Sequence, residues 1–569
     1  MRFMKFLRSL RSIIVLYALA ALFTAASAQI VRPDLNRVRT YDVQHYLIRV
    51  KFDRPAKKVL GDTTVTLTPL KPLSQIVLDS AGIKYDSVSL DSEGPNLQFT
   101  VAGEKITVDL PRTYQPGETI AIRFKYSAVP TKGVYFVPEQ IENGIEMHSA
   151  QIWTQGEAEE ARHWFPSFDF PSDKATTEQY ITANDGETVI ANGEFIDKIK
   201  NSDGTITHHF KMTVPHSTYL LSFVIGKYSV TSDKYGDVPL GYYVYPGKEP
   251  LVPKAFGITK DVLRVYEELT GVKFPYNKYD QTIVAGFTFG GMENITATTL
   301  ADSEVFLANF DFGKSTVEDL VSHEAAHSWF GDLVTCKNWA ELWLNEGFAT
   351  YMEAAFREKM YGRQNYLLKI RNDADTFMID DSINQRRNGL FNENAVDTDR
   401  LFDRPATTYN KGGVVLHMLR EEIGDAPFWK GVNVYLNAHK FGNVETGDLR
   451  KAMEETSGRD LGWFFDQWVY GTSFPKLTIR QTYDAKAKMV KLSVTQTQKA
   501  DRLTPSAFRL PMELEFKSGA ATRTEKIDIT KRAEVFTIKS DAAPASLKFD
   551  PNQKIPLKSI KMLGSGRNN

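Results

Sequence analysis

One short stretch, from His323 to Glu346, constrains the fold of this chain more than any other. It reads HEAAH from His323 to His327, and eighteen residues then separate His327 from Glu346. Histidines four residues apart share one face of a helix, so both imidazoles point at one spot only if the stretch is helical. The spacing therefore predicts two neighbouring helices, one with the histidines and one with Glu346.

The flanking residues support both helices. Ser315 and Glu318 have the spacing of a capping box, which predicts a helix start two turns before His323. Apolar residues at helical spacing follow in this first run. A second helical run covers 340–361 and ends at Gly362.

The residue types in this stretch are those of a catalytic metal site. His323, His327 and Glu346 make the three-residue ligand set of a catalytic zinc, one ion per chain, with a fourth position open to water. The Glu324 carboxylate lies beside the first histidine, where it can accept a proton from that water. Buried core histidines are the alternative reading, and the helical context favours the metal site.

Composition excludes some classes of protein. Of the 569 residues, 42% are hydrophobic and 24% are charged, as in a globular protein rather than a disordered chain. The formal net charge is −1, and it becomes more acidic once the basic N-terminal segment is removed. We therefore expect no nucleic-acid partner.

The first 28 residues read as a secretory signal peptide. Four basic residues precede a short apolar run from Ile13 to Phe23, and Ala26-Ser27-Ala28 then supplies small residues for cleavage before Gln29. The run is shorter than the roughly 20 residues of a membrane-spanning helix. We expect an exported protein, periplasmic or secreted, with no membrane association after cleavage.

Cys336 is the only cysteine, so the chain cannot form an internal disulfide. It lies between the two predicted helices, where a thiolate ligand is conceivable. Its apolar and aromatic neighbours, Val334 and Trp339, favour a buried packing role instead.

Hydrophobic periodicity predicts an α+β protein of three domains. Apolar residues alternate with polar ones at the start of the chain, which predicts an antiparallel β domain at 29–228. A mainly helical domain follows at 229–473, with one β stretch at 281–289. The two-residue period then returns and predicts a small β-sandwich at 474–563, before a tail at 564–569.

Two short motifs outside the helices carry candidate site residues. The segment TQGE at 154–157 has carboxylates and aromatic residues around it, which is more typical of a site wall than of a strand. A solvated loop is the alternative. At the end of the β stretch, Gly290 and Gly291 leave room for a second backbone, as an extended peptide requires. Turn glycines account for the same letters equally well.

Four motifs together resemble the aminopeptidase N and leukotriene hydrolase family of zinc exopeptidases, which is of the thermolysin-like gluzincin type. They are TQGE at 154–157, GGMEN at 290–294, the set His323/Glu324/His327/Glu346, and Tyr409 with Lys411-Gly412. The resemblance covers roughly 41–475. It implies an N-terminal β saddle, a thermolysin-like zinc catalytic domain and a C-terminal β-sandwich. Many members end in a helical superhelix, and we expect none here.

The resemblance also implies a role for each site residue. Glu324 is the general base and Tyr409 donates its hydroxyl to the tetrahedral oxyanion, although a lone tyrosine is more often a packing residue. Glu157 and Glu293 hold the free α-ammonium of a peptide. The remaining substrate-binding set comprises Gly290 and Gly291 for the peptide backbone, Phe289 and Met292 for the first side chain, and Gln155.

These features predict a zinc-dependent aminopeptidase that cleaves peptides with a free N-terminus. One alternative is a thermolysin-type endopeptidase, which shares the metal and the base but lacks paired carboxylates for an amine. A second is lipid epoxide hydrolysis, a side activity in one branch of the family. A third is a non-catalytic peptide-binding scaffold. The sequence leaves the oligomeric state open.

Overall fold

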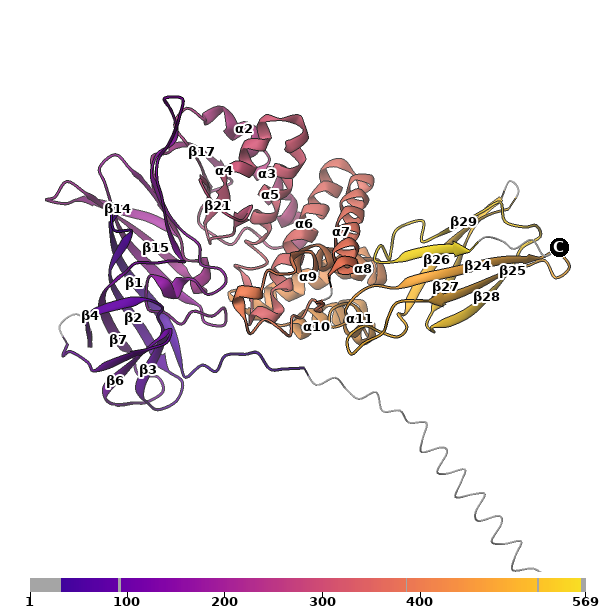
Figure 1. The fold of residues 1–569 in the computed structure, drawn as a ribbon, viewed down its shortest axis with the longest axis horizontal. Helices are drawn as coiled ribbons and strands as arrows, with labels where there is room; N and C mark the ends of the chain where they lie inside the picture. Colours follow the sequence, from indigo (N-terminus) through magenta and orange to yellow (C-terminus); the bar gives the residue numbers. More distant parts are fainter. Residues whose placement is uncertain (1–31, 91–93, 385, 519–520, 564–569) are drawn as a thin grey trace, which may run out of the picture. The chain divides into compact units, whose positions relative to one another are not determined.

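The computed structural model describes residues 32–90, 94–384, 386–518 and 521–563 (Figure 1). The chain divides into two units, Met1–Leu35 and Asn36–Asn569. Residues 32–35 of the first unit carry neither helix nor strand. The predicted signal peptide and the predicted tail at 564–569 lie outside the described residues. Among the described helices, none is both long and apolar enough to cross a membrane.

The first region of the larger unit is built from strands. Its principal sheet has seven strands in the order β14-β15-β12-β1-β2-β7-β4, and smaller sheets have the orders β13-β16-β11-β8, β3-β6-β5 and β10-β9. The strands are β1 (Tyr41–Asp53), β2 (Lys58–Pro69), β3 (Leu73–Asp79), β4 (Ile83–Leu90), β5 (Phe99–Ala102), β6 (Lys105–Tyr114), β7 (Ile120–Ala128), β8 (Val134–Val137), β9 (Gln140–Glu142), β10 (Ile145–His148), β11 (Gln151–Thr154), β12 (Ala175–Ala183), β13 (Thr188–Ala191), β14 (Glu194–Lys200), β15 (Ile206–His216) and β16 (Phe223–Gly226).

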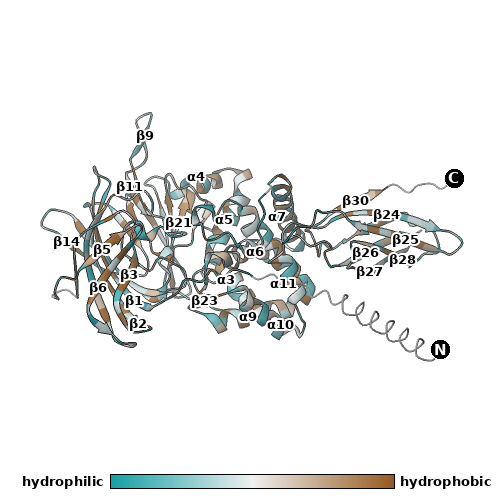
Figure 2. Ribbon diagram, turned by 60° about the horizontal axis from the view of Figure 1, so that its bottom comes forward, coloured by the Kyte–Doolittle hydropathy of each residue, from teal (hydrophilic) through white to brown (hydrophobic). Residues whose placement is uncertain are grey.

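Alternating hydrophobic residues place the core of this region between its sheets. Along β1, the side chains of Tyr46, Ile48 and Val50 are buried while their neighbours are more exposed. They join a hydrophobic cluster to which the strands of three sheets contribute. Figure 2 shows the corresponding change between brown and teal segments along these strands. The two-residue period therefore predicted a β-rich region correctly. The sheet is not wholly antiparallel as expected, because β1 and β12 pair in parallel at its centre.

Strand β11 leads directly to the TQGE motif. The chain leaves β11 at Thr154, and Gly156 then passes the backbone of Tyr219 so closely that a Cβ atom on Gly156 would lie 2.3 Å from the Tyr219 carbonyl oxygen. Only glycine fits this approach. The crossing fixes where Gln155 and Glu157 emerge from the β region.

The second region combines a five-stranded sheet, of order β17-β18-β19-β21-β20, with most of the helices. Its strands are β17 (Ser229–Tyr235), β18 (Val238–Val244), β19 (Tyr279–Val284), β20 (Gly291–Met292) and β21 (Ala297–Ala301), with a separate pair β22 (Val334–Cys336) and β23 (Gly442–Val444). Its α-helices are α2 (Val252–Ala255), α3 (Thr259–Thr270), α4 (Asp302–Val305), α5 (Lys314–Ala326), α6 (Trp343–Tyr361), α7 (Arg363–Ile383), α8 (Gly412–Ile423), α9 (Asp425–His439), α10 (Thr446–Ser457) and α11 (Gly462–Trp468).

The structure corrects two local expectations in this region. Helix α5 begins at Lys314 after Gly313, whose conformation is helical and which makes no side-chain cap, so Ser315 lies inside the helix and the predicted capping box does not form. The strand expected at 281–289 ends at Val284. Phe289 therefore lies in the loop between β19 and β20. The predicted second helix is present as α6, and it ends before Gly362 as expected.

Helices α6 and α8 cross with almost no space between their backbones. A Cβ atom on Gly412 would lie 2.7 Å from the Cα atom of Gly347. The contact requires glycine on the α8 side, since any larger residue would push the helices apart. Glu346 precedes one of these glycines, and the Tyr409 segment leads into the other. The crossing therefore brings these two candidate site residues to one place.

The third region consists of two sheets, of order β28-β25-β24-β30 and β27-β26-β29. Partly buried side-chain bonds link it to the helices. For example, His417 of α8 donates from Nε2 to the Gln553 carbonyl oxygen (2.8 Å), and the Gln467 amide of α11 donates to the Arg509 carbonyl oxygen (3.1 Å). The strands are β24 (Lys476–Asp484), β25 (Met489–Gln496), β26 (Leu510–Ser518), β27 (Ala521–Ile529), β28 (Ala533–Lys539), β29 (Ser546–Phe549) and β30 (Ser559–Leu563).

Candidate functional site

A cavity of about 600 Å³ collects most of the residues that the sequence singled out. It lies where the end of β11, the β20 edge, helices α5 to α7 and the segment before α8 meet. The sequence-predicted residues on its wall are Gln155, Glu157, Phe289, Gly290, Gly291, Glu293, His323, Glu324, His327, Glu346 and Tyr409.

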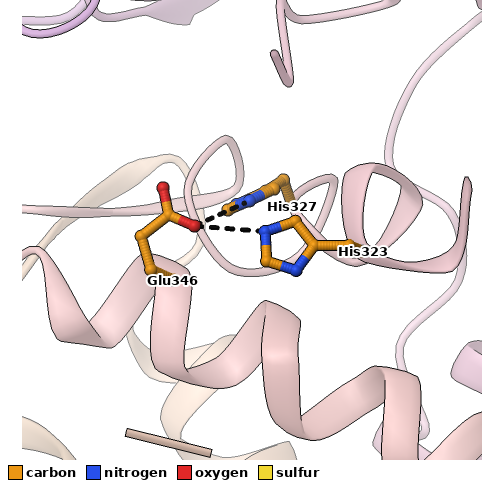
Figure 3. A group of neighbouring side chains, drawn as sticks. All are labelled: His323, His327 and Glu346. Carbon is orange, nitrogen blue, oxygen red and sulfur yellow. Dashed lines mark hydrogen bonds and ion pairs between the residues drawn. The ribbon is translucent and has the colours of Figure 1, made fainter. Parts of the chain in front are cut away.

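Three side chains of types that can bind a metal converge on one point of this cavity. His323 and His327 project from α5 and its end, and Glu346 projects from the first turn of α6 (Figure 3). The Glu346 Oε2 atom lies 3.2 Å from His323 Nε2 and 3.4 Å from His327 Nε2. The three donor atoms lie within 4.8 Å of one another.

These separations fit a zinc ion. Zinc binds imidazole nitrogen and carboxylate oxygen at roughly 2.0–2.2 Å, so tetrahedral ligand atoms lie roughly 3.3–3.5 Å apart. Both distances from the Glu346 oxygen are close to that separation. An ion held by these three side chains alone would keep a position open for water or substrate. This donor set fits catalytic rather than structural zinc.

The other nitrogen of each imidazole is already committed. His323 Nδ1 donates to Glu353 Oε1 at 2.7 Å, and His327 Nδ1 donates to the Phe330 carbonyl oxygen at 2.9 Å. Such bonds fix the tautomer and the ring orientation of a metal-binding histidine. Both Nε2 atoms are therefore left to face Glu346. Glu353 is not among the residues predicted from the sequence, although it lies seven residues after Glu346 and hence on the same helix face.

The electrostatics of the three donors favour a bound cation. Burial raises the pKa of Glu346, but the two imidazoles outweigh this effect and hold the pKa at about 2. Burial lowers the pKa of His323, whereas hydrogen bonds to Glu346 and Glu353 raise it to about 10. The ionised Glu346 carboxylate is thus stabilised by positive charge on the two imidazoles. A divalent cation bound at the same place supplies positive charge without protonation of either histidine.

A second group of acidic side chains lies beside the metal donors. One oxygen each from Glu157, Glu293 and Glu346 lies within 4.8 Å of the other two. All three residues are buried, and Oε1 of Glu157 and of Glu293 has no hydrogen-bond partner among the described residues. Burial, then repulsion by Glu293, raises the pKa of Glu157 well above its usual value. Glu293 Oε1 also lies 3.8 Å from His327 Nδ1. Two buried carboxylates with oxygens that accept no hydrogen bond favour a cation or donor at this place.

Glu324 and Tyr409 flank the same space, and burial raises the pKa of both side chains. Glu324 is 5% exposed, and its Oε2 atom has no partner among the described residues. Burial raises the pKa of Glu324 to about 8, although both imidazoles act to lower it. Tyr409 lies in a π-helical segment, Thr407–Lys411, and burial raises the pKa of its phenol well above 10. Its hydroxyl therefore keeps its proton and can donate.

The predicted side-chain pocket is only partly assembled as expected. Phe289 is 44% exposed in the cavity, and its ring centroid lies 5.8 Å from that of Phe402, a residue that the sequence analysis missed. Met292 is buried, and its sulfur accepts a hydrogen bond from the Gln155 amide at 3.2 Å. No local pattern marks Phe402, because only the fold brings it opposite Phe289.

Comparisons with known proteins point to one family. The description "Peptidase family M1 domain" matches residues 254–468, and "Peptidase M1 N-terminal domain" matches residues 42–220. Together the two matches span more than half of the chain.

Relatives with established names share this similarity. A protein named Probable aminopeptidase 2, from Sulfurisphaera tokodaii, is 31% identical over 71% of this chain and 50% of its own length. Aminopeptidase N from Streptomyces lividans is 33% identical over 61% and 41%, and aminopeptidase N from Lactobacillus helveticus is 29% identical over 86% and 58%. The chain thus spans about half the length of the relatives that it matches.

Proposed function

Because the chain belongs to peptidase family M1, a family of zinc metallopeptidases, we propose that it is a zinc-dependent aminopeptidase. It removes the first residue from peptides with a free N-terminus and holds one zinc ion with His323, His327 and Glu346. One observation carries the proposal: the buried carboxylates of Glu157 and Glu293, whose Oε1 atoms accept no hydrogen bond from the described residues, lie beside the proposed metal donors. An endopeptidase has no use for such a pair.

The chemistry of the reaction depends on groups around the donor set. When bound, zinc polarises the scissile carbonyl and acidifies water toward neutral pH. Glu324 accepts a proton from the attacking water and then delivers it to the departing amine. The Tyr409 hydroxyl donates a hydrogen bond to the oxyanion that develops on the former carbonyl oxygen. Both side chains line the cavity that holds the donors.

Glu157 and Glu293 determine where the peptide is cut. An α-ammonium beside a divalent cation is repelled unless negative groups hold it, and both carboxylates are buried in a partly desolvated cleft. Charge-assisted bonds from the ammonium to both residues anchor the peptide at its first residue. The first peptide bond would then lie beside the side chains that hold zinc, and only a single residue would be released.

The β20 edge supports the peptide chain. Strand β20 (Gly291–Met292) pairs with β21 on one side and ends the sheet on the other. An extended peptide adds to such an edge through main-chain hydrogen bonds. Gly290 and Gly291 line the cavity beside this edge. A Cβ atom on Gly291 would overlap the Glu324 carboxylate, so glycine at this position leaves room for Glu324. Phe289 and Phe402 contact the side chains of the bound peptide.

A panel of fluorogenic aminoacyl substrates tests the proposal directly. We expect hydrolysis that a chelator abolishes and that one equivalent of zinc restores. An internally quenched peptide with a blocked N-terminus is the control for endopeptidase activity, and we expect it to stay intact. Cleavage of the blocked peptide without release of free amino acids would contradict the proposal, and so would a purified protein that binds no zinc.

We infer finer features of the fold from the same resemblance. The β region at 29–228 is a β saddle, residues 229–473 form a thermolysin-like catalytic domain, and residues 474–563 form a β-sandwich. The sheet orders described above support these assignments.

We also propose that the protein is exported, to the periplasm or the medium. The basic and apolar pattern of residues 1–28 carries this proposal. Fractionation of cells that express the full chain tests it: the exported protein should begin at Gln29, and deletion of residues 2–28 should retain it in the cytoplasm. Recovery of the full-length chain in the cytoplasm would contradict export.

A further inference from the structure

Helix α7 (Arg363–Ile383) carries two buried charges that the proposed reaction does not use. Lys369 and Asp373 lie one turn apart and are 8% and 4% exposed. The Lys369 ammonium lies 2.9 Å from both carboxylate oxygens of Asp373. Buried charges are costly, and replacement by apolar residues of similar volume is often neutral or stabilising. Stability therefore does not explain these charges, and their contacts are a better guide to their role.

At one end, the two charges reach a metal donor. Lys369 Nζ lies 2.9 Å from Glu353 Oε2, while the other oxygen of Glu353 accepts from His323 Nδ1 at 2.7 Å. Glu353 is 7% exposed, so both contacts are largely shielded from solvent. The ammonium of Lys369 therefore fixes the carboxylate that in turn fixes the imidazole.

At the other end, the same charges reach the segment that carries Tyr409. The Asn410 amide donates to Asp373 Oδ1 at 2.8 Å. Asn410 follows Tyr409 within the π-helical segment Thr407–Lys411. Short π-helical segments occur frequently at functional sites, and their backbone is less regular than that of an α-helix. A side-chain bond to a rigid helix restricts how such a segment can rotate.

We propose that Glu353, Lys369, Asp373 and Asn410, here called the α7 bridge, set the position of the Tyr409 hydroxyl relative to the His323 imidazole. Lys369 and Asp373 act as positioning residues, because they hold other groups rather than the reacting atoms. The inference rests on the proposed function in one respect, since Tyr409 must act on the transition state. The link between Lys369 and the metal donor does not depend on that function.

A substrate-binding role is the main alternative, because Lys369, Glu353 and Asn410 also reach the wall of the cavity. The two roles separate in the kinetics. Loss of a substrate contact raises KM, whereas a misplaced oxyanion donor lowers kcat and leaves KM unchanged.

A double-mutant cycle tests the Tyr409 end. A misplacement of 1 Å can lower the rate about 100-fold. We expect Asn410→Ala to lower kcat by a smaller factor, about tenfold, with KM unchanged. In a Tyr409→Phe background, Asn410→Ala should have no further effect on kcat, because no hydroxyl remains to be positioned. If the kcat effects of Asn410→Ala and Tyr409→Phe multiply in the double variant, the proposal is overturned. An effect of Asn410→Ala on KM alone would also overturn it.

Zinc binding tests the other end without any measurement of activity. Loss of a residue that orients a metal-binding histidine lowers metal affinity by roughly 10- to 100-fold, and we expect this for Lys369→Met in competition with a chromophoric chelator. Lys369→Gln keeps N–H donors at that position and should fall between wild type and Lys369→Met. Asn410→Ala should bind zinc as the wild type does. Unchanged zinc affinity in both Lys369 variants would overturn the proposal.

Arg357→Gln is the matched control. The Arg357 guanidinium pairs with Asp319 at 2.7 and 2.6 Å and ties α6 to α5 close to His323, but it bonds to no member of the α7 bridge. This variant should lose thermal stability while kcat and zinc affinity stay as in the wild type. If wild-type protein cleaves no aminoacyl substrate, the proposed function fails, and the zinc measurements still decide whether Lys369 positions His323. Equal loss of zinc affinity in Arg357→Gln and Lys369→Met would assign Lys369 a merely structural role.

Discussion

The ring of Tyr409 stacks against the imidazole of His323, with centroids 5.9 Å apart and an angle of 17° between the planes. This contact places the phenol next to the metal donors without making it a ligand, since a phenol that keeps its proton is a hydrogen-bond donor. The hydroxyl is therefore available to an oxyanion that forms beside the metal.

Tyr409→Phe keeps the stacked ring and removes only the hydroxyl. We expect kcat to fall by roughly 10²- to 10³-fold with little change in KM, as for the loss of one oxyanion donor. Steady-state kinetics on an aminoacyl substrate, with zinc content measured in parallel, checks this. An effect confined to KM would instead assign the hydroxyl to binding of the ground state.

Glu324→Gln should separate metal binding from proton transfer. Glu324 is not one of the three side chains that are proposed to hold zinc, which are His323, His327 and Glu346. We therefore expect the variant to retain zinc. Its kcat should fall by several orders of magnitude, because an amide cannot accept the proton of the attacking water. Metal analysis and single-turnover kinetics measure the two properties. Substantial turnover in this variant would remove Glu324 from the role of general base.

Glu293→Ala should weaken the hold on a free amino terminus. The buried Glu293 carboxylate accepts no hydrogen bond at Oε1 from the described residues, and with Glu157 it forms the proposed ammonium site. We expect KM to rise at least tenfold for free peptides, which corresponds to about 1.4 kcal/mol or more of lost binding. An N-acetylated peptide is the matched control. If the wild type cleaves it as well as its free counterpart, the ammonium does not determine the cleavage position.

How far the sequence predicts this site depends on how local each relationship is. The two histidines share one helix, so their spacing alone predicted that they converge. The spacing could also have identified Glu353, because a residue seven positions after Glu346 lies on the same face of the helix. The predicted capping box at Ser315 does not form, because α5 begins at Lys314 and Ser315 lies inside the helix. The residue types of a capping box also occur in the interior of helices.

Other members of the site could not be predicted from local patterns. The pairing of Asp373 with Asn410 depends on how α7 packs against a π-helical segment 37 residues further along the chain. Glu157 reaches the donors only because Gly156 passes close to Tyr219 in another part of the β region. Resemblance to a family identified Glu157, but periodicity and spacing did not. Contacts between distant segments are the part of the structure that a single sequence leaves open.

The Phe289–Phe402 pair should influence which first residues are accepted. The rings contact each other at 5.8 Å between centroids and line the cavity. An aromatic contact contributes roughly 0.5–1.5 kcal/mol beyond the area that it buries. We therefore expect Phe402→Ala to lower kcat/KM about tenfold for a phenylalanyl substrate and much less for an alanyl substrate. An equal loss on both substrates would indicate that Phe402 serves the fold rather than selectivity.

Acid should destabilise the protein partly through His417. This side chain is fully buried, its Nε2 donates to the Gln553 carbonyl oxygen, and its Nδ1 accepts from the Tyr366 hydroxyl at 2.7 Å. Burial lowers its pKa to about 4, against roughly 6.5 in an unfolded chain. Between these values the unfolded state binds more protons, so stability rises with pH across this window and is lost as pH falls.

At pH 5 this loss amounts to roughly 2 kcal/mol relative to neutral pH. We expect His417→Gln to melt at a lower temperature than the wild type at pH 7, because two buried hydrogen bonds are altered, but to lose less stability between pH 7 and pH 5. Thermal melts of both proteins in excess chelator check this, so that zinc release does not contribute. His216, whose pKa burial also lowers to about 4, offers a second variant with the same expectation. An equal loss between pH 7 and pH 5 in wild type and both variants would show that buried neutral histidines do not contribute to the acid sensitivity.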